Sequence, residues 1–401
     1  MKSLEGHTLL IITDRYPHSG DYLSSSFVKN QVEQLKCHFK KVYVISLTPY
    51  VPKLFSHLPF VNPRWKRDVL AQDYEYENVQ VFFARYFTLP IPFARMRKGD
   101  ASLKAAKRLI IHKGIKFDLI HAHFTWPSGY VGVRLKEEYG KPVITTIHEN
   151  GDWFDQEVEM NHPLINTAWS GADALIRVNR KDVPVLKRYN ERVYSIPNGF
   201  SPAFHPIDTV IARDRLGLPG NAKVIFTLGN LNKRKGFNYL IDAMEHICSQ
   251  RDDVLCFIGG AGLERGSLQG QIDRLRLGEK VKLLGSVPGD QLTLWMNACD
   301  IFVLPSLSES FGIVQLEALA CGKPVVATRN GGSEEVIISD EYGLLADPAD
   351  PEDLAEKILV ALDRKWDGEA ILRYAEQFTW ENIAQQIIEV YYEVSEGFNK
   401  R

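Results

Sequence analysis

Short apolar runs alternate with longer amphipathic stretches along the whole chain. Runs such as "HTLLIITD" and "PVITTIH" are rich in β-branched residues and have the length of buried strands. Between such runs, stretches such as "SFVKNQVEQLKCHF" and "ASLKAAKRLIIHKG" repeat apolar residues at helical spacing. This alternation predicts a parallel, doubly wound α/β sheet.

The alternation pauses once, between Tyr194 and about Val210, and then begins again. The intervening stretch, "YSIPNGFSPAFHPIDTV", has the Pro, Asn and Gly content of a linker or hinge. We therefore predict two Rossmann-like parallel α/β domains, at residues 1–198 and 199–382. Ligands of such sheets bind beyond the carboxyl ends of the strands, so we expect a cleft where the two domains face each other.

Composition and charge narrow the class of protein. With 401 residues, 45% hydrophobic and 24% charged, the chain can form two cores, and its apolar runs fall far short of the ~20 residues that cross a bilayer. The N-terminal residues lack the features of a signal peptide, and the five cysteines are scattered without a C-x-x-C pair. We expect a cytoplasmic protein with reduced thiols.

The net charge of −2 hides an asymmetry between the two halves. Residues 1–200 contain 28 basic and 20 acidic side chains, a net charge of +8, whereas residues 201–401 contain 20 and 30, a net charge of −10. The segment 49–100 is basic, aromatic and interrupted by prolines, which fits either an irregular loop that covers the sheet or a binding surface. Its basic side chains include Arg64, Lys66, Arg67, Arg95, Arg97 and Lys98.

Two glutamates stand eight residues apart in "PSLSESFGIVQLEALACG", where a strand-like run passes through a loop into a helix. One interpretation is an extended anionic ligand, with Glu309 near one end, Glu317 near the other and phosphates over the main-chain amides between them. Those amides belong to Phe311, Gly312 and Ile313. The alternative is that both carboxylates are solvated helix surface.

A second candidate site is the basic loop in "TLGNLNKRKGFNYL". A strand ends at Gly229, two basic residues, Arg234 and Lys235, follow, and Gly236 permits close approach as a helix begins. Such cations suit a diphosphate, although a solvated basic turn has the same composition. After the first strand, "YPHSGDYLSSSF" has only Gly20, which does not make a dinucleotide-binding fingerprint.

Histidines occur at the ends of two predicted strands. His148 opens a polar loop, "HENGD", and is a candidate for the site, whereas His121 and His123 alternate along one strand and are interpreted as structural. The chain has no H-E-x-x-H, C-x-x-C, D-x-D or G-x-S-x-G motif. The sequence therefore lacks the motifs that would indicate a zinc hydrolase, a serine hydrolase or a metal-dependent enzyme.

Taken together, these segments resemble the retaining glycosyltransferases of family 4, which have the GT-B fold of two facing Rossmann-like domains. The resemblance covers almost the whole chain and depends on the order and spacing of many short segments. They include "DLIHAH", "SIPNGFSPAFHP", "GNLNKRKG", "LPSLSESFGIVQLEALACGKPVVAT", "NGGSEEVI" and "FTWENIAQQIIEVY". It also implies that a C-terminal helix, about 383–401, packs back on the N-terminal domain.

The resemblance implies a role for each matching position. Glu309 would contact the donor sugar and His148 would lie beside donor sugar and acceptor, so these two are the candidate catalytic residues. Basic side chains would neutralise the diphosphate, Glu317 would bind the ribose and the segment at Val287 would hold the base. The full set of candidate donor contacts is Gly20, Asn230, Arg234, Lys235, Val287, Phe311, Gly312, Ile313 and Glu317.

Two departures from the family pattern stand out. Asn230 occupies a position where the family often has Arg, and Arg234 is the candidate replacement. The family's His-Gly-x-Asp becomes His148-Glu-Asn-Gly-Asp152 here, which leaves the partner of His148 open.

The implied activity is retaining transfer of a hexosyl group from a UDP- or GDP-sugar to a glycan or lipid-linked acceptor. Fixed cations at the leaving diphosphate make a metal dispensable, so neither a metal nor another cofactor is expected. Two alternatives stay open: a GT-B sugar-nucleotide epimerase, and a non-catalytic nucleotide-sugar-binding protein. We expect no nucleic acid among the partners.

The basic N-terminal half also suggests where the protein works. In this family that domain receives the acceptor, and here it combines cations with aromatic residues such as Trp65, Phe87 and Phe93. We expect peripheral contact with an anionic membrane at its cytoplasmic face. Scattered, solvated charges are the alternative.

Overall fold

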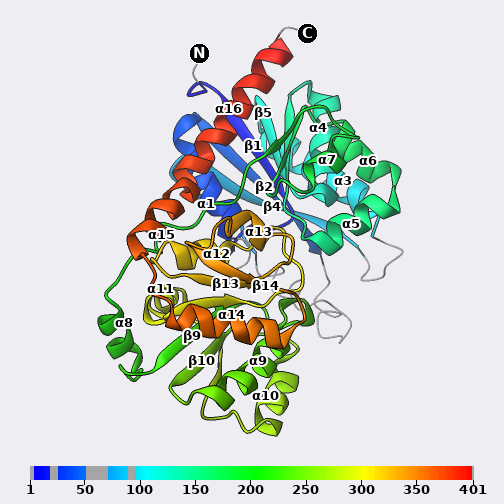
Figure 1. Ribbon diagram of the computed structural model, residues 1–401. Helices are drawn as coiled ribbons and strands as arrows, with labels where there is room; N and C mark the ends of the chain where they lie inside the picture. The colour runs from blue at the N-terminus through cyan, green and yellow to red at the C-terminus, as the bar shows by residue number, and fades with distance from the viewer. Residues whose placement is uncertain (1–3, 19–25, 51–70, 89–94, 400–401) are drawn as a thin grey trace. The chain divides into compact units, whose positions relative to one another are not determined.

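The computed structural model describes residues 4–18, 26–50, 71–88 and 95–399 (Figure 1). These residues form two compact units. Unit 1 comprises Met1–Pro197 together with Trp380–Arg401, and unit 2 comprises Asn198–Thr379. Each unit has its own parallel sheet, so the predicted fold class of two parallel α/β domains is confirmed.

Unit 1 is built on an eight-stranded sheet in the order β3-β4-β2-β1-β5-β6-β7-β8. The strand pairs are parallel apart from β3, which runs antiparallel to β4 at the edge. The strands are β1 (Thr8–Thr13), β2 (Lys41–Tyr50), β3 (Tyr74–Tyr76), β4 (Val79–Phe87), β5 (Leu119–His123), β6 (Val143–Ile147), β7 (Ala174–Arg177) and β8 (Val193–Ser195).

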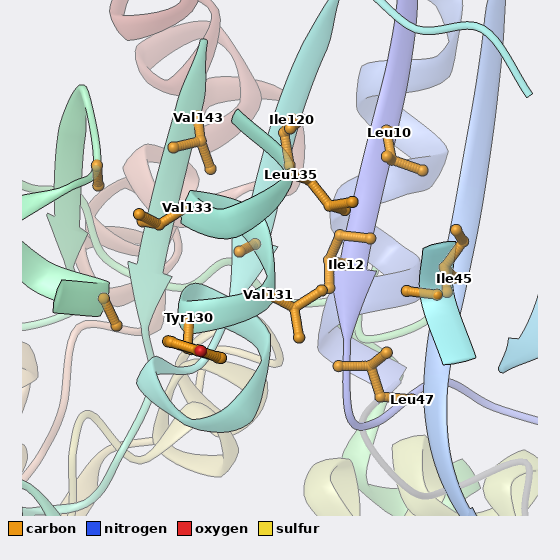
Figure 2. Packing of buried hydrophobic residues seen from close by; sticks show 14 of the residues in the cluster. Leu10, Ile12, Ile45, Leu47, Ile120, Tyr130, Val131, Val133, Leu135 and Val143 are labelled. Atoms are coloured by element: carbon orange, nitrogen blue, oxygen red, sulfur yellow. The ribbon is translucent and has the colours of Figure 1, made fainter. Parts of the chain in front are cut away.

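Helices cover both faces of this sheet. Successive residues of a strand point to opposite faces, so each strand contributes to two buried clusters. Leu10 and Ile12 of β1 belong to one buried cluster, in which they pack with Val131 and Leu135 (Figure 2). The neighbouring residues of β1, Leu9 and Ile11, belong to the cluster on the other face. In the part of unit 1 that the structure describes, the α-helices are α1 (Ser26–Leu35), α3 (Lys98–Lys113), α4 (Tyr130–Tyr139), α5 (Gly151–Met160), α6 (Pro163–Ser170), α7 (Val183–Leu186) and α16 (Trp380–Asn399).

The C-terminal helix α16 belongs to unit 1 although almost two hundred residues separate it from β8. Its buried residues Ile383, Ile387 and Tyr391 join the cluster that contains Val28 and Val32 of α1. Figure 1 shows this helix, in red, lying along unit 1 beside α1. The sequence resemblance implied such a helix at about 383–401, and α16 begins at Trp380.

Unit 2 has a six-stranded, fully parallel sheet in the order β11-β10-β9-β12-β13-β14. Its strands are β9 (Lys223–Leu228), β10 (Val254–Gly259), β11 (Val281–Gly285), β12 (Ile301–Leu304), β13 (Val325–Thr328) and β14 (Gly343–Ala346). Its α-helices are α8 (Thr209–Leu216), α9 (Phe237–Gln250), α10 (Arg265–Arg274), α11 (Gly289–Ala298), α12 (Ile313–Leu319), α13 (Ser333–Val336), α14 (Pro351–Asp363) and α15 (Gly368–Ala375).

The predicted linker has little regular structure between β8 and α8. The two ends of unit 2 meet where Phe200 donates its main-chain N–H to the Phe378 carbonyl, at 3.1 Å. Among the described helices, none has the length and hydrophobicity required to span a bilayer. The five cysteines are unbridged; Cys256, Cys299 and Cys321 are buried and Cys37 is exposed.

Candidate functional site

The basic loop, residues 229–236, and the glutamate loop, residues 305–312, follow neighbouring strands of unit 2. β9 and β12 run parallel and side by side, so their carboxyl ends bring the two loops to one edge of the sheet. The Arg234 carbonyl accepts a hydrogen bond from the Leu307 N–H at 2.7 Å, and the Arg234 guanidinium donates to the Ser308 carbonyl. The two loops are therefore joined by one main-chain hydrogen bond and by one hydrogen bond from the Arg234 side chain.

Glu309 lies between the two cations of the basic loop. Its Oε1 is 2.6 Å from Nζ of Lys235 and its Oε2 is 3.2 Å from Nη1 of Arg234. The carboxylate is almost completely buried. Burial alone would raise the pKa of this carboxyl, but Lys235 and Arg234 outweigh it and hold the pKa below its ordinary value. The cluster of one anion and two cations thus keeps a net positive charge.

Gly236 allows the basic loop to come this close to β12. It has a φ of 64°, and a Cβ at this position would lie 2.0 Å from the Pro305 carbonyl oxygen. A side chain would therefore meet both a strained backbone conformation and a main-chain clash. The preceding turn is held by Asn232, whose Oδ1 accepts from the Lys235 N–H at 3.3 Å. The glycine thus sets the position of the Lys235 ammonium group.

In the segment between the two glutamates, two main-chain carbonyls have hydrogen-bond partners and three main-chain N–H groups have none among the described residues. Gly312 is in the left-handed region at φ 82°, and the buried amide of Gln315 donates to the carbonyls of Phe311 and Gly312, at 3.2 and 3.3 Å. In the described part of the chain, no group accepts a hydrogen bond from the N–H groups of Phe311, Gly312 and Ile313. These three predicted ligand contacts therefore have free donors.

Glu317 differs sharply from Glu309, although the two are in one sequence motif. It lies on α12, is partly buried, and receives no hydrogen bond from any residue that the structure describes. Burial without a cation raises its pKa to about 7. Near neutral pH this carboxyl is therefore poised between its two protonation states, and a ligand that donates hydrogen bonds would favour the ionised form.

The glutamate loop is supported by the turn at Asn330–Ser333, which the sequence analysis named only as part of the family resemblance. The Asn330 carbonyl accepts from the Glu309 N–H at 3.1 Å, and its side-chain oxygen accepts from the N–H groups of Gly332 and Ser333. A Cβ on Gly332 would lie 2.7 Å from the Phe311 nitrogen. The Asn-Gly-Gly-Ser composition could have predicted a turn here. The contact between this turn and Glu309 depends on strand order, which the composition does not indicate.

The remaining donor-site candidates are placed differently. The Val287 side chain is buried against Gly259, so this residue would reach a base only through its main chain. Asn230 is exposed in the basic loop. Gly20 lies outside the described residues.

The glycine-rich turn "GGAGLERG" after β10 has a packing role. Gly260 passes so close to the Gly229 carbonyl that a Cβ would lie 1.8 Å from its oxygen.

His148 lies at the end of β6 in unit 1, next to a histidine that the sequence analysis treated as structural. Its Nε2 is 3.0 Å from Nδ1 of His123 at the end of β5. Burial, with the His123 ring as a further cause, lowers the pKa of His148 well below the ordinary value. The polar loop after it begins α5, and Glu149 accepts from the Thr125 N–H at 2.7 Å.

The predicted membrane-contact segment is only partly described. Trp65 and Phe93 lie outside the described residues, whereas Phe87 is exposed at the end of β4. The Arg95 guanidinium lies over the Trp153 ring, 4.7 Å from its centroid, and 3.6 Å from Glu157. Arg95 thus has an internal anionic partner, and membrane contact stays a prediction.

Comparisons with known proteins cover both units. The family model "Glycosyl transferases group 1" matches residues 209–378, and "Glycosyltransferase Family 4" matches residues 60–204. An uncharacterised glycosyltransferase of Methanocaldococcus jannaschii is 30% identical over 351 residues, which cover 81% of this chain and 88% of that protein. D-inositol 3-phosphate glycosyltransferase 2 of Catenulispora acidiphila is 31% identical over 313 residues, with 70% and 72% covered.

Solved structures share the fold at lower identity. Sucrose-phosphate synthase of Thermosynechococcus elongatus has a TM-score of 0.78 at 24% identity, covering 98% of this chain and 100% of that one. HepE of Anabaena, solved in complex with UDP-glucose, has a TM-score of 0.71 at 22% identity, covering 96% and 100%. These structures have the GT-B fold, and the two units described here correspond to it.

The close approach at Gly236 generates a prediction about stability. Gly236→Ala should lower the free energy of unfolding of unit 2 by about 2 kcal/mol or more, because it combines left-handed strain with a main-chain clash. Gly217→Ala is the matched control, since Gly217 has a φ of 66° and nothing within 4 Å of the added Cβ. Hydrogen exchange in peptides of unit 2 measures both variants. Equal destabilisation by the two substitutions would contradict the clash.

Proposed function

The chain belongs to the group 1 glycosyltransferases and has their GT-B fold, and we propose that it transfers a hexosyl group from a UDP- or GDP-sugar with retention of configuration. The acceptor would be a glycan or a lipid-linked glycan, and no metal would take part. The observation that carries this proposal is the buried cluster of Glu309 with Lys235 and Arg234. HepE, a neighbour in fold, has been solved with UDP and with UDP-glucose, which supports a nucleotide-sugar donor.

The charge of the cluster suits the leaving group of this reaction. Cleavage of the anomeric bond develops negative charge on the nucleoside diphosphate. Preorganised positive groups stabilise such charge most effectively where water is excluded. Lys235 is mostly buried and held in place by Glu309, so little reorganisation is needed when charge develops. The free N–H groups at Phe311, Gly312 and Ile313 would add donors for phosphate or sugar oxygens.

Glu309 and Glu317 suit the two ends of the same donor. Glu309 is kept ionised and could accept hydrogen bonds from sugar hydroxyls beside the diphosphate. Glu317 has no cationic partner among the described residues and would accept from ribose hydroxyls. In the proposed layout, the base lies along the main chain near Val287. His148 would contact a sugar hydroxyl group.

Turnover with and without acceptor tests the proposed function. Purified protein is given UDP-glucose, UDP-N-acetylglucosamine and GDP-mannose, each with and without a mixture of glycan and lipid-linked acceptors, and excess EDTA is added in parallel. We expect acceptor-dependent release of a nucleoside diphosphate, an α-linked product from an α-linked donor, and full activity with chelator. Conversion of donor to its epimer without acceptor would favour the epimerase, and loss of activity to chelator would contradict metal independence.

The cluster of Glu309 with Lys235 and Arg234 predicts that removal of a cation and removal of the anion have opposite effects on nucleotide affinity. Lys235→Ala should weaken UDP or GDP binding by about 1 to 3 kcal/mol, the contribution of a charge-assisted contact. Lys233→Ala removes the same charge from an exposed position of the same loop and is the matched control. Glu309→Gln should bind free nucleotide at least as tightly as wild type, because it removes an anion beside the diphosphate, yet lose turnover. Isothermal titration calorimetry decides between these outcomes. If Glu309→Gln weakened nucleotide binding as strongly as Lys235→Ala, the assignment of Glu309 to the sugar would be wrong.

The raised pKa of Glu317 predicts that nucleotide binding releases protons. The folded pKa is about 7, so the carboxyl is partly protonated at pH 7, and ribose hydroxyls that donate to it would favour the ionised form. The nucleotide should bind more tightly as pH rises from 6 to 8. Calorimetry at pH 7 in buffers of different ionisation enthalpy measures the release. Glu317→Gln is the control, since the titration of the diphosphate itself is common to both proteins, and equal release in both would rule out Glu317 as the source.

A further inference from the structure

Three imidazole rings stack at the carboxyl ends of β5 and β6 in unit 1. The ring centroids of His121 and His123 are 4.4 Å apart, and those of His123 and His148 are 5.3 Å apart with planes inclined by only 13°. All three side chains are buried. Burial lowers the pKa of each, that of His123 to about 3, so the stack is neutral at physiological pH.

The hydrogen bonds of the stack are distributed unevenly. Both nitrogens of His121 have partners, since Nδ1 is 2.6 Å from the Tyr391 hydroxyl and Nε2 is 2.7 Å from Oγ1 of Thr146. His123 and His148 share a single hydrogen bond, between Nδ1 of His123 and Nε2 of His148. The other nitrogen of each is buried and has no hydrogen-bond partner among the described residues.

Only two proton arrangements are compatible with this pair. Each neutral imidazole has one N–H and one lone pair, and exactly one proton lies between the two rings. If His148 donated, the remaining N–H of the pair would be Nε2–H of His123, which is fully enclosed at 0% exposure. If His123 donates, the remaining N–H is on Nδ1 of His148; this nitrogen is also enclosed, but the residue as a whole is 7% exposed and follows β6 directly into the polar loop.

The second arrangement is the less costly one. An enclosed N–H without an acceptor is rarer in proteins than an acceptor that lacks a donor. Placing the unpartnered N–H on His148 puts it on the residue of the pair that has some exposed surface. A polyhydroxylated ligand offers acceptor oxygens that would satisfy this N–H.

We propose that His123 is a positioning residue: it donates from Nδ1 to Nε2 of His148 and thereby fixes His148 as a neutral hydrogen-bond donor through Nδ1–H. The ligand contact of His148 rests on the proposed transferase function, whereas the tautomer belongs to the free protein. In this state His148 has no lone pair available to a ligand. It orients an oxygen atom of donor or acceptor, and the acceptor proton leaves with the diphosphate.

Nitrogen-15 spectroscopy of histidine-labelled protein tests the tautomer directly. In the free wild type, Nδ1 of both His123 and His148 should have the shift of a protonated nitrogen, and Nε2 of both the shift of an unprotonated one. Signals are assigned by their loss in His148→Gln and in His123→Leu. Tyr391→Phe removes a hydroxyl from His121 without touching the pair, so it should leave the His148 tautomer unchanged. A protonated Nε2 on His148 in the wild type would overturn the proposal, whatever the variants do.

Kinetics of two substitutions at one position test the positioning role. His123→Leu removes the donor, and we expect the tautomer of His148 to change and kcat to fall about tenfold, the effect of one lost hydrogen bond, with UDP affinity unchanged. His123→Asn can donate from its amide and should restore most of kcat and the wild-type tautomer. Equal loss in both variants would overturn the positioning role. If the protein transferred no sugar but had the expected tautomer, the proposed function would be wrong, whereas the proton arrangement of His123 and His148 would be supported.

Discussion

The donor-site edge of unit 2 depends on one buried anion held between two cations. A carboxylate in the interior is costly unless it is paired and hydrogen-bonded, and removal of its partners would leave an uncompensated charge. Glu309 meets this requirement with Lys235 at 2.6 Å and Arg234 at 3.2 Å. Because the anion and the cations come from loops after different strands, satisfying the charge also fixes the two loops relative to each other.

The main chain reinforces the same junction. Gly236 permits an approach to the Pro305 carbonyl that a side chain would block, and Asn330 accepts a hydrogen bond from the Glu309 amide. The Gln315 amide donates to the carbonyls of Phe311 and Gly312, and the N–H groups of these two residues have no acceptor among the described residues. A rigid frame around a net positive cluster is the arrangement that electrostatic stabilisation of a leaving group requires.

The two glutamates show how position alone separates the chemistry of identical side chains. Glu309 and Glu317 are eight residues apart, yet cations lower the pKa of the first and burial raises that of the second to about 7. Unit 1 makes a similar distinction between histidines. His121 is saturated by Tyr391 and Thr146, whereas His123 has one hydrogen bond, and it goes to His148.

The sequence alone determined the fold class and singled out the two loops of unit 2 that form the candidate site, because these depend on local patterns. Strand length, helical periodicity and Gly, Pro and Asn punctuation act over a few residues, so they predicted two parallel α/β domains and placed both Lys235 and Glu309 in loops after strands. Pairing of these two residues, the support from Asn330 and the bond between His123 and His148 were decided only by tertiary structure. Each of these contacts joins loops that follow different strands, and their proximity depends on strand order and register, which no local pattern records.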